Sequence, residues 1–383
     1  MNILVFSWRD PKHPLAGGAE QVMHEHMKGW IRAGHSVTLF SSKVSDLKNE
    51  EEIDRVKIIR KGNQYLGVQI EAFLFYRKNR KTYDLVVDQF HGLPFFTPLY
   101  SRKPIIAVIQ ETAGKVWFLN PFPKPLNWLV GLIGYITEPL FFLFYRNTKF
   151  VTGSLSAKID VTKMGVPVKN ISVWPHGVII KNNKTFIKEK KKTICFLGVL
   201  SKDKGIIDAI KCFRFLAQIR DNYQFWVIGK PETKKFKIEI SKLIAESGLE
   251  NKVKFWGFVS QQKKFELLKR SHILINPSIR EGWGLVNIEA NAMSVPVVSY
   301  KAAGLTDSVK QNYSGVFVKR NTPQEMALTI ERLLGNRIKY LKLCKTSLLW
   351  SKQFNWVNSV KISIKTINKL VKTYQSGQAL SRE

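Results

Sequence analysis

Residues 277–290 read Pro277-Ser-Ile-Arg-Glu281-Gly-Trp-Gly-Leu-Val-Asn-Ile-Glu289-Ala290, and they follow an apolar strand, Ile273-Leu-Ile-Asn276. The pattern predicts a strand end that turns into a helix near Gly284. The first amides of such a helix lack intrahelical partners, and with the helix dipole they favour an anion. Glu281 stands just before this site, and Glu289 lies about one and a half turns into the helix. The segment therefore offers a phosphate cradle and two acceptors for hydroxyl groups, which a nucleotide-sugar requires.

Working outward, apolar strands alternate with helical patterns along the whole chain, which indicates βαβ units and parallel sheets. The first series begins at Asn2, and a second begins at Thr193-Ile-Cys-Phe-Leu-Gly198, after a lysine-rich stretch over 181–192 that is interpreted as a linker. We therefore predict an α/β fold with two doubly wound Rossmann-like domains, and such halves place a cleft between the carboxyl ends of their strands. The predicted bounds are 1–175, 176–355 and a last segment, 356–383.

Two glycine loops precede helices at the start of each series. The loop from Arg9 to Gly18 ends in Gly17-Gly18, and paired glycines let the backbone approach a phosphate or a sugar closely. In the second series, Gly198 is followed by Lys204-Gly205, which would bring an ammonium group to a diphosphate. The alternative for the Gly17-Gly18 loop is a helix start that binds no ligand. The alternative for Lys204 is a solvated lysine.

Taken together, Glu281-x7-Glu289 and the two loops resemble the family 4 glycosyltransferases of the GT-B fold, over about residues 2–375. The resemblance implies that Gly17 and Gly18 cap the donor diphosphate. It implies that Lys204 binds the same diphosphate, next to Gly198. The amides of Gly284 and Leu285, which follow Gly282 in the sequence, are expected to bind phosphate. It implies that Glu281 holds hydroxyls of the donor sugar and Glu289 those of the ribose. It also implies that the last helix crosses back to the first domain, and that no bound metal or cofactor is needed.

The chain departs from the family pattern in several places. Val199 stands where relatives carry an arginine for the diphosphate, so one cation is missing unless Lys202 or Arg280 supplies it. Ser294 and Ala303 are milder departures, and His176 stands where relatives often have asparagine; it is interpreted as part of a turn in the cleft wall.

The acceptor side is expected at two strand ends of the first domain. Asp88-Gln-Phe-His91 ends one strand, and Gln110-Glu111 ends the next. Gln110 stands where many relatives carry a histidine, and an amide can donate a hydrogen bond but cannot carry a proton. Asp88, His91 and Glu111 are candidates for acceptor contact, with His91 considered for catalysis, although a lone histidine is more often structural.

The net charge of +32 favours an anionic partner. The apolar segment 115–146 contains Leu126–Phe144, whose single charge is Glu138, and Arg146 and Lys149 follow it. We interpret it as lying in a lipid interface; a helix buried in the first domain and a transmembrane span are the alternatives. The C-terminal region is basic, with ten Lys or Arg and no acidic residue from Arg337 to Arg382. It fits a solvated helix that packs on the protein by its apolar side at least as well as a helix that contacts a membrane.

The sequence thus predicts a retaining glycosyltransferase that uses a UDP- or GDP-sugar and acts on a lipid-linked glycan or glycolipid. Its three isolated cysteines indicate a reducing compartment, so we expect it in the cytoplasm, peripheral on the cytoplasmic face of an anionic membrane. A soluble acceptor, and a nucleotide-sugar-binding protein without turnover, are the alternatives. A nucleic-acid partner is not expected, because the basic residues are dispersed and no binding motif is found.

Overall fold

The computed structural model describes residues 1–64, 66–120, 122–178 and 187–380. It divides into two compact units, Met1–Gly177 with the chain from Trp356, and Val178–Asn355. The boundary lies two residues beyond the one expected at 175. Residues 181–186 of the expected linker lie outside the described residues. The part from Lys188 to Lys192 is held on the second unit, where the Lys188 Nζ donates to the Ser271 carbonyl and the Glu189 amide to the Arg270 carbonyl.

The first unit is built on an eight-stranded sheet of order β3-β4-β2-β1-β5-β6-β7-β8, in which β3 alone runs antiparallel to its neighbour. The strands are β1 Asn2–Ser7, β2 Ser36–Ser41, β3 Glu50–Ile53, β4 Val56–Arg60, β5 Leu85–Gln89, β6 Ile105–Val108, β7 Lys149–Thr152 and β8 Ile171–Val173. The helices are α1 Gly18–Arg32, α2 Gly67–Asn79, α3 Leu126–Phe144, α4 Leu155–Lys163 and α12 Trp356–Leu380, with 3₁₀ turns η1 Thr97–Leu99, η2 Gly114–Leu119 and η3 Val168–Asn170.

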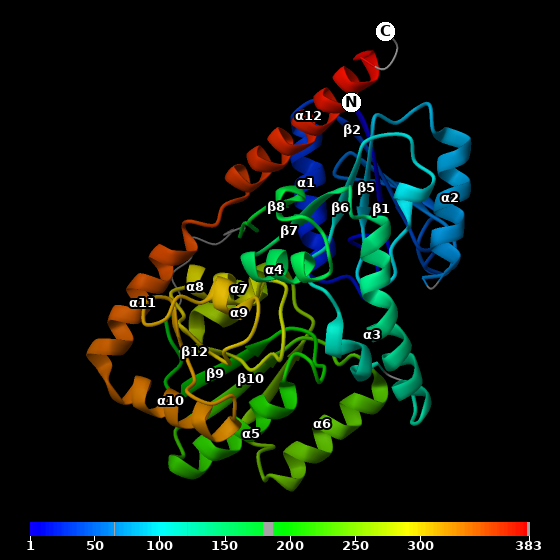
Figure 1. The fold of residues 1–383 in the computed structure, drawn as a ribbon. Helices are drawn as coiled ribbons and strands as arrows, with labels where there is room; N and C mark the ends of the chain where they lie inside the picture. Colours follow the sequence, from blue (N-terminus) through cyan, green and yellow to red (C-terminus); the bar gives the residue numbers. More distant parts are fainter. Residues whose placement is uncertain (65, 121, 179–186, 381–383) are drawn as a thin grey trace. The chain divides into compact units, whose positions relative to one another are not determined.

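Alternating side chains of β1 feed cores on opposite faces of this sheet. Ile3 and Val5 belong to the core with Trp30 of α1 and Ile367 of α12, whereas Phe6 belongs to the core with α2. Helix α12 lies along α1, where the Trp30 indole donates to the Ser363 hydroxyl at 2.9 Å (Figure 1). The last helix is therefore an integral part of the first unit.

The second unit has a six-stranded parallel sheet of order β11-β10-β9-β12-β13-β14. Its strands are β9 Lys192–Leu197, β10 Tyr223–Ile228, β11 Val253–Gly257, β12 Ile273–Asn276, β13 Val297–Ser299 and β14 Gly315–Phe317. Its helices are α5 Ile206–Ile219, α6 Lys234–Glu246, α7 Gln261–Arg270, α8 Leu285–Ala292, α9 Leu305–Ser308, α10 Pro323–Gly335 and α11 Arg337–Ser351.

Both sheets change winding direction next to their first strand. In the second unit the change falls between β9 and β12, and in the first unit between β1 and β5. The connections on either side of such a switch point leave the sheet over opposite faces, so a crevice opens between them at the carboxyl ends of the strands. The predicted α/β class with two Rossmann-like sheets is confirmed, and Lys204 and Glu281 follow the two strands at the switch point of the second unit.

Candidate active site

Two loops lie against each other at the switch point of the second unit. A Cβ on Gly205 would come within 2.2 Å of the Pro277 carbonyl oxygen, and the Gly205 φ of +75° is in the left-handed region. The Ile279 amide donates to the Asp203 carbonyl at 2.9 Å. Glycine is thus required at 205 both for the turn and for the close approach. The contact joins the loop after β9 to the loop after β12.

This contact brings Lys204 and Glu281 together across 77 residues of sequence. The Lys204 Nζ lies 3.0 Å from the Glu281 Oε2, and the Ser278 hydroxyl donates to the Glu281 Oε1 at 3.1 Å. The side chains are only 25% and 16% exposed, which limits how well water screens the pair. The structure therefore places the predicted cation and carboxylate side by side.

The backbone of Glu281 is fixed by a second close contact. Its amide donates to the Ala303 carbonyl at 3.1 Å. A Cβ on Gly304, whose φ is +77°, would lie 1.9 Å from the Glu281 carbonyl oxygen. Ala303, one of the departures from the family pattern, thus still binds the Glu281 backbone through its carbonyl group. Gly304 allows the two loops to approach this closely.

Helix α8 begins where the sequence predicts, with Gly284 as its left-handed cap at a φ of +81°. Behind the cap, the Asn287 carboxamide donates to the Ser308 hydroxyl and accepts from Asn276, both at 2.9 Å. Gly282 and Gly284 are buried, and Leu285 is half-buried at the first helical position. The buried amide network fixes the start of the helix, whose first amides are the expected phosphate donors.

Glu289 also has a lysine partner. The Lys264 Nζ, one helix away on α7, pairs with the Glu289 Oε1 at 2.5 Å, and their side chains are 13% and 6% exposed. Burial of this kind makes an ion pair costly to break, because the remaining charge keeps its desolvation penalty. The sequence pattern did not reveal Lys264, since its pairing depends on the register of α7 against α8.

Two neighbouring strands, β9 and β10, are each followed by a glycine beside this site. Gly198 after β9 has a φ of +148°, and a Cβ there would meet no atom within 4 Å. A Cβ on Gly229 after β10 would lie 1.8 Å from the Gly198 carbonyl oxygen. Val199 is 48% exposed. The Lys202 ammonium lies 3.9 Å from the Glu239 carboxylate on α6.

In the first unit, Gly17 caps α1, and Gly18 is its first residue. The Gly17 amide donates to the Glu20 carboxylate at 2.7 Å, which gives Glu20 a capping role. Both glycines are exposed, and a Cβ on Gly18 would meet no atom within 4 Å. Packing within the protein thus does not require glycine at 18, whereas the close approach of a ligand would.

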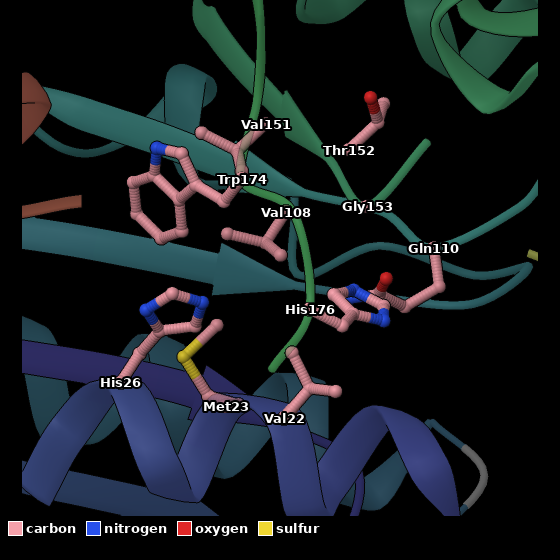
Figure 2. Close-up of a pocket in the computed structure, with 10 residues that line it drawn as sticks. All are labelled: Val22, Met23, His26, Val108, Gln110, Val151, Thr152, Gly153, Trp174 and His176. Atoms are coloured by element: carbon pink, nitrogen blue, oxygen red, sulfur yellow. The ribbon is translucent and has the colours of Figure 1, made fainter. Parts of the chain in front are cut away.

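Gln110 lies beside His176 in the lining of a small cavity, to which Val108 of β6 and Val151 of β7 also contribute (Figure 2). A Cβ on Gly153 would lie 2.8 Å from the Gln110 Oε1 and 2.2 Å from the His176 Nε2, so these side chains converge there. The Gln110 Oε1 has no hydrogen-bond partner among the described residues. The cavity of about 10 Å³ has room for about one water molecule.

The two histidines of this cavity are buried. Burial lowers the pKa of His176 to about 4. Burial, and then repulsion by His176, lowers the pKa of His26 to about 3. Both rings are therefore neutral near pH 7, and neither is poised to exchange a proton with a substrate. His176 belongs to the cavity wall of the first unit.

The remaining candidates follow β5 and β6. His91 is exposed, and Glu111 is half-buried. Asp88 is fully buried and accepts hydrogen bonds from the Thr97 hydroxyl at 2.7 Å and from the Tyr145 hydroxyl at 2.5 Å. Burial raises the Asp88 pKa despite these donors. The expectation that Asp88 contacts an acceptor is therefore wrong, because its carboxyl group is used to hold the loop after β5.

Comparison with known proteins gives a consistent picture. Residues 16–181 match the model of Glycosyltransferase Family 4, and residues 179–347 match that of Glycosyl transferases group 1. Two uncharacterized glycosyltransferases of Methanocaldococcus jannaschii are similar in sequence: MJ1069 is 31% identical over 72% of this chain and 71% of its own length, and MJ1607 is 28% identical over 88% and 90%.

Solved structures share the fold at low sequence identity. A sucrose-phosphate synthase from Thermosynechococcus elongatus has a TM-score of 0.81 at 18% identity, over 97% of this chain and 99% of that one. Anabaena HepE, solved in complex with UDP-glucose, has a TM-score of 0.72 at 17% identity, over 96% of this chain and 100% of its own. With its two Rossmann-like units and these matches, the chain belongs to the family 4 glycosyltransferases of the GT-B fold.

Proposed function

We propose that this glycosyltransferase moves a sugar, with retention of configuration, from a nucleoside-diphosphate sugar to a lipid-linked glycan or glycolipid. The second unit would bind the donor, and the first unit would bind the acceptor. The donor is a UDP- or GDP-sugar, and no metal or cofactor takes part. The observation that carries this proposal is the Lys204–Glu281 pair at the switch point, directly before the first turn of α8.

The pair explains how the donor is held. A diphosphate at the start of α8 would draw the Lys204 ammonium from Glu281, because it carries more negative charge than one carboxylate. Glu281, which also accepts from Ser278, would then receive hydroxyl groups of the sugar. Glu289 would receive those of the ribose. Gly17 and Gly18 would add backbone donors to the diphosphate from the first unit.

Chemistry then depends on charge that develops on the leaving diphosphate. Lys204 and the amides of Gly284 and Leu285 are fixed before the reaction, so they stabilise that charge without reorganisation. Gln110 cannot take the acceptor's proton. In a retaining transfer the leaving phosphate can take it, and Gln110, His91 and Glu111 would then orient the acceptor.

The test is transfer of a labelled sugar by purified variants. Glu281→Gln and Lys204→Ala each remove one contact, and each is expected to lower kcat by on the order of 100-fold or more. Lys202→Ala is the matched control, because that lysine points to α6, and it should keep wild-type turnover. Thermal unfolding checks that all variants fold. Wild-type turnover in Glu281→Gln and Lys204→Ala would refute the assignment.

The alternative of donor binding without turnover is motivated by Val199 and Gln110. A thermal-shift screen with UDP- and GDP-sugars detects binding, because a ligand of the folded state raises the unfolding midpoint. Binding without product from either soluble or lipid-linked acceptors would favour this alternative. Product from soluble acceptors alone would mean that the acceptor is soluble and not lipid-linked. It would also remove the reason for the location that we propose, on the cytoplasmic face of a membrane.

A further inference from the structure

Helix α3 leaves most of its apolar surface uncovered. Gly131, Gly134, Glu138 and Phe142 are its buried residues, and they form a single narrow stripe at helical spacing. The large exposed side chains are between 44% and 63% accessible: Leu126, Trp128, Leu129, Leu132, Ile133, Tyr135, Ile136, Leu140, Leu143 and Phe144. An exposed apolar patch of this extent marks an interaction surface.

The buried stripe of α3 packs along its length against the rest of the first unit. The Glu138 carboxylate accepts from the Ala113 amide at 2.6 Å, the Gly114 amide at 2.7 Å and the Trp117 indole at 3.1 Å. A Cβ on Gly134 would lie 2.3 Å from the Trp117 ring, so the indole packs on bare backbone. If α3 left this seat to cross a bilayer, the Glu138 carboxylate would enter hydrocarbon without its donors.

The exposed surface continues beyond α3 across the loop at η1. The Phe96 ring lies 5.6 Å from that of Phe141 and 5.9 Å from that of Phe144. Leu99 on the same loop is 62% exposed, and the neighbouring Tyr100 ring lies 5.1 Å from that of Phe73 on α2. The outer side of α2 adds Leu66, Ile70 and Leu74, spaced four residues apart and 63%, 60% and 49% exposed. The α2–α3 surface, as we call these residues, thus spans two helices and a loop.

Cations lie along the segments that form this surface. Between residues 96 and 149 there are six basic residues and only two acidic ones, of which Glu138 is buried and Glu111 half-buried. Lys124 and Arg146, just beyond the two ends of α3, are exposed. Arg77, Lys78, Arg80 and Lys81 are exposed at the end of α2. Basic groups beside apolar side chains complement anionic headgroups above acyl chains.

We propose that the α2–α3 surface inserts into one leaflet of an anionic bilayer, with α3 in the plane of the interface and not across it. The charge pattern favours lipid over a second copy of this chain, because like-charged rims would repel across a dimer. The inference deepens the proposed function, since it gives the enzyme a seat at a lipid-linked acceptor. It is measurable without sugar transfer.

The first experiment is co-sedimentation with vesicles. The wild type should bind vesicles of phosphatidylcholine and phosphatidylglycerol in a roughly 3:1 ratio, and binding should weaken as salt rises. The double variant Leu132→Glu/Ile136→Glu should lower vesicle binding at least tenfold. The control Ile338→Glu, which changes an 84% exposed isoleucine of α11, should leave vesicle binding unchanged. Equal binding by all three proteins would overturn the proposal. The proposal would also be overturned if the wild type formed a dimer without lipid and Leu132→Glu/Ile136→Glu made that dimer dissociate.

The second experiment separates the in-plane helix from a span. Lys124→Cys and Asn147→Cys place thiols at exposed positions beyond the two ends of α3, in a Cys344→Ser background. With protein added outside sealed vesicles, an impermeant maleimide should label both positions. Protection of one of them would show a span. Transfer to a short-chain soluble acceptor is assayed in parallel: vesicle binding without transfer fails only the proposed function, and transfer without vesicle binding fails only this surface.

Discussion

At the scale of single residues, both glutamates of the Glu281-x7-Glu289 pattern have a lysine partner. Lys204 comes from the loop after β9, and Lys264 from α7. Each carboxylate is thus neutralised and oriented by a cation from another element. Under the proposed mechanism, Lys204 turns from Glu281 to the diphosphate when a donor binds, so it is in place before the transfer step.

Lys264 offers a test of the outer glutamate. In Lys264→Met, Glu289 remains on α8, but its carboxylate loses the cation that orients it. Donor binding should therefore weaken about tenfold, a loss of about 1.4 kcal/mol. The value of kcat should change little, because Glu289 is expected at the ribose and not at the bond that breaks. Initial rates against donor concentration give both constants.

The adjacent lysine serves as control for that experiment. The Lys263 Nζ pairs with Glu266 at 2.7 Å and not with Glu289. Lys263→Met should therefore keep the wild-type KM. A wild-type KM in Lys264→Met, or an equal rise in both variants, would show that Lys264 has no particular role in placing Glu289.

The strand pattern and the family resemblance were enough to assign Lys204 and Glu281 to one site, because loops after neighbouring strands of a parallel sheet meet at one edge. It could not reveal Ser278 or Lys264, whose contacts depend on rotamers and on the register of one helix against another. Asp88 was misassigned for a similar reason. A polar residue at a strand end can face the crevice or turn inward, and only the positions of Thr97 and Tyr145 show that it turns inward.

At the scale of elements, the site depends on loops that touch backbone to backbone. Gly304 before α9 lies against the Glu281 carbonyl group, at a left-handed φ. Gly304→Ala should push the Glu281 loop away and strain the turn, so transfer should fall at least tenfold while the second unit remains folded. Steady-state rates and circular dichroism measure the two quantities.

Gly248→Ala controls for the cost of the backbone conformation alone. Gly248 also has a positive φ, of +62°, but a Cβ there would meet no atom within 4 Å. Both variants should lose stability, because alanine disfavours this region, and only Gly304→Ala should lose activity. Equal activity in the two variants would mean that the contact with Glu281 is dispensable.

The periodic elements were the most predictable part of the chain. The helix that begins near Gly284 and the apolar helix Leu126–Phe144 were both evident from pattern, and both are observed. How α3 is seated was not predictable. The sequence shows its glycines and Glu138, but Glu138 finds its donors at Ala113, Gly114 and Trp117, which lie 21 to 25 residues away.

At the scale of the whole molecule, the first unit contains a group whose charge opposes folding. His26 lies among Trp30, Trp174 and Trp356, and its pKa of about 3 is below the ordinary value of 6.5. The folded unit therefore holds His26 neutral, while the unfolded chain takes up a proton below pH 6.5. The stability from this difference is complete above pH 6.5 and is lost as the pH falls from 6.5 toward 3.

This linkage is measurable by urea unfolding followed through tryptophan fluorescence. Between pH 7 and pH 5, wild-type protein should lose about 2 kcal/mol through His26 alone. His26→Phe should lose that much less over the same range, whereas His91→Phe, at an exposed position, should behave like the wild type. Parallel pH profiles for wild type and His26→Phe would contradict the argument.

The whole fold was largely predictable, because strands and helices alternate throughout and restart at Thr193. The first boundary was placed two residues early. Gly177 packs against Trp356, where a Cβ would lie 2.4 Å from the Trp356 amide nitrogen, so the chain leaves and re-enters the first unit at one point. No pattern in the local sequence marks such a contact between residues far apart in the chain.

Helix α12 has a consequence for biosynthesis. Because α12 covers Trp30 and Trp174 of the first unit, that unit lacks one of its helices until the ribosome has also made Val178–Asn355. At about 5–20 residues per second, the delay is roughly ten to forty seconds. During this time the emerging amino-terminal half exposes apolar surface on which chaperones act, while the continuous second unit can fold. The part of the enzyme that is synthesised first is thus completed last.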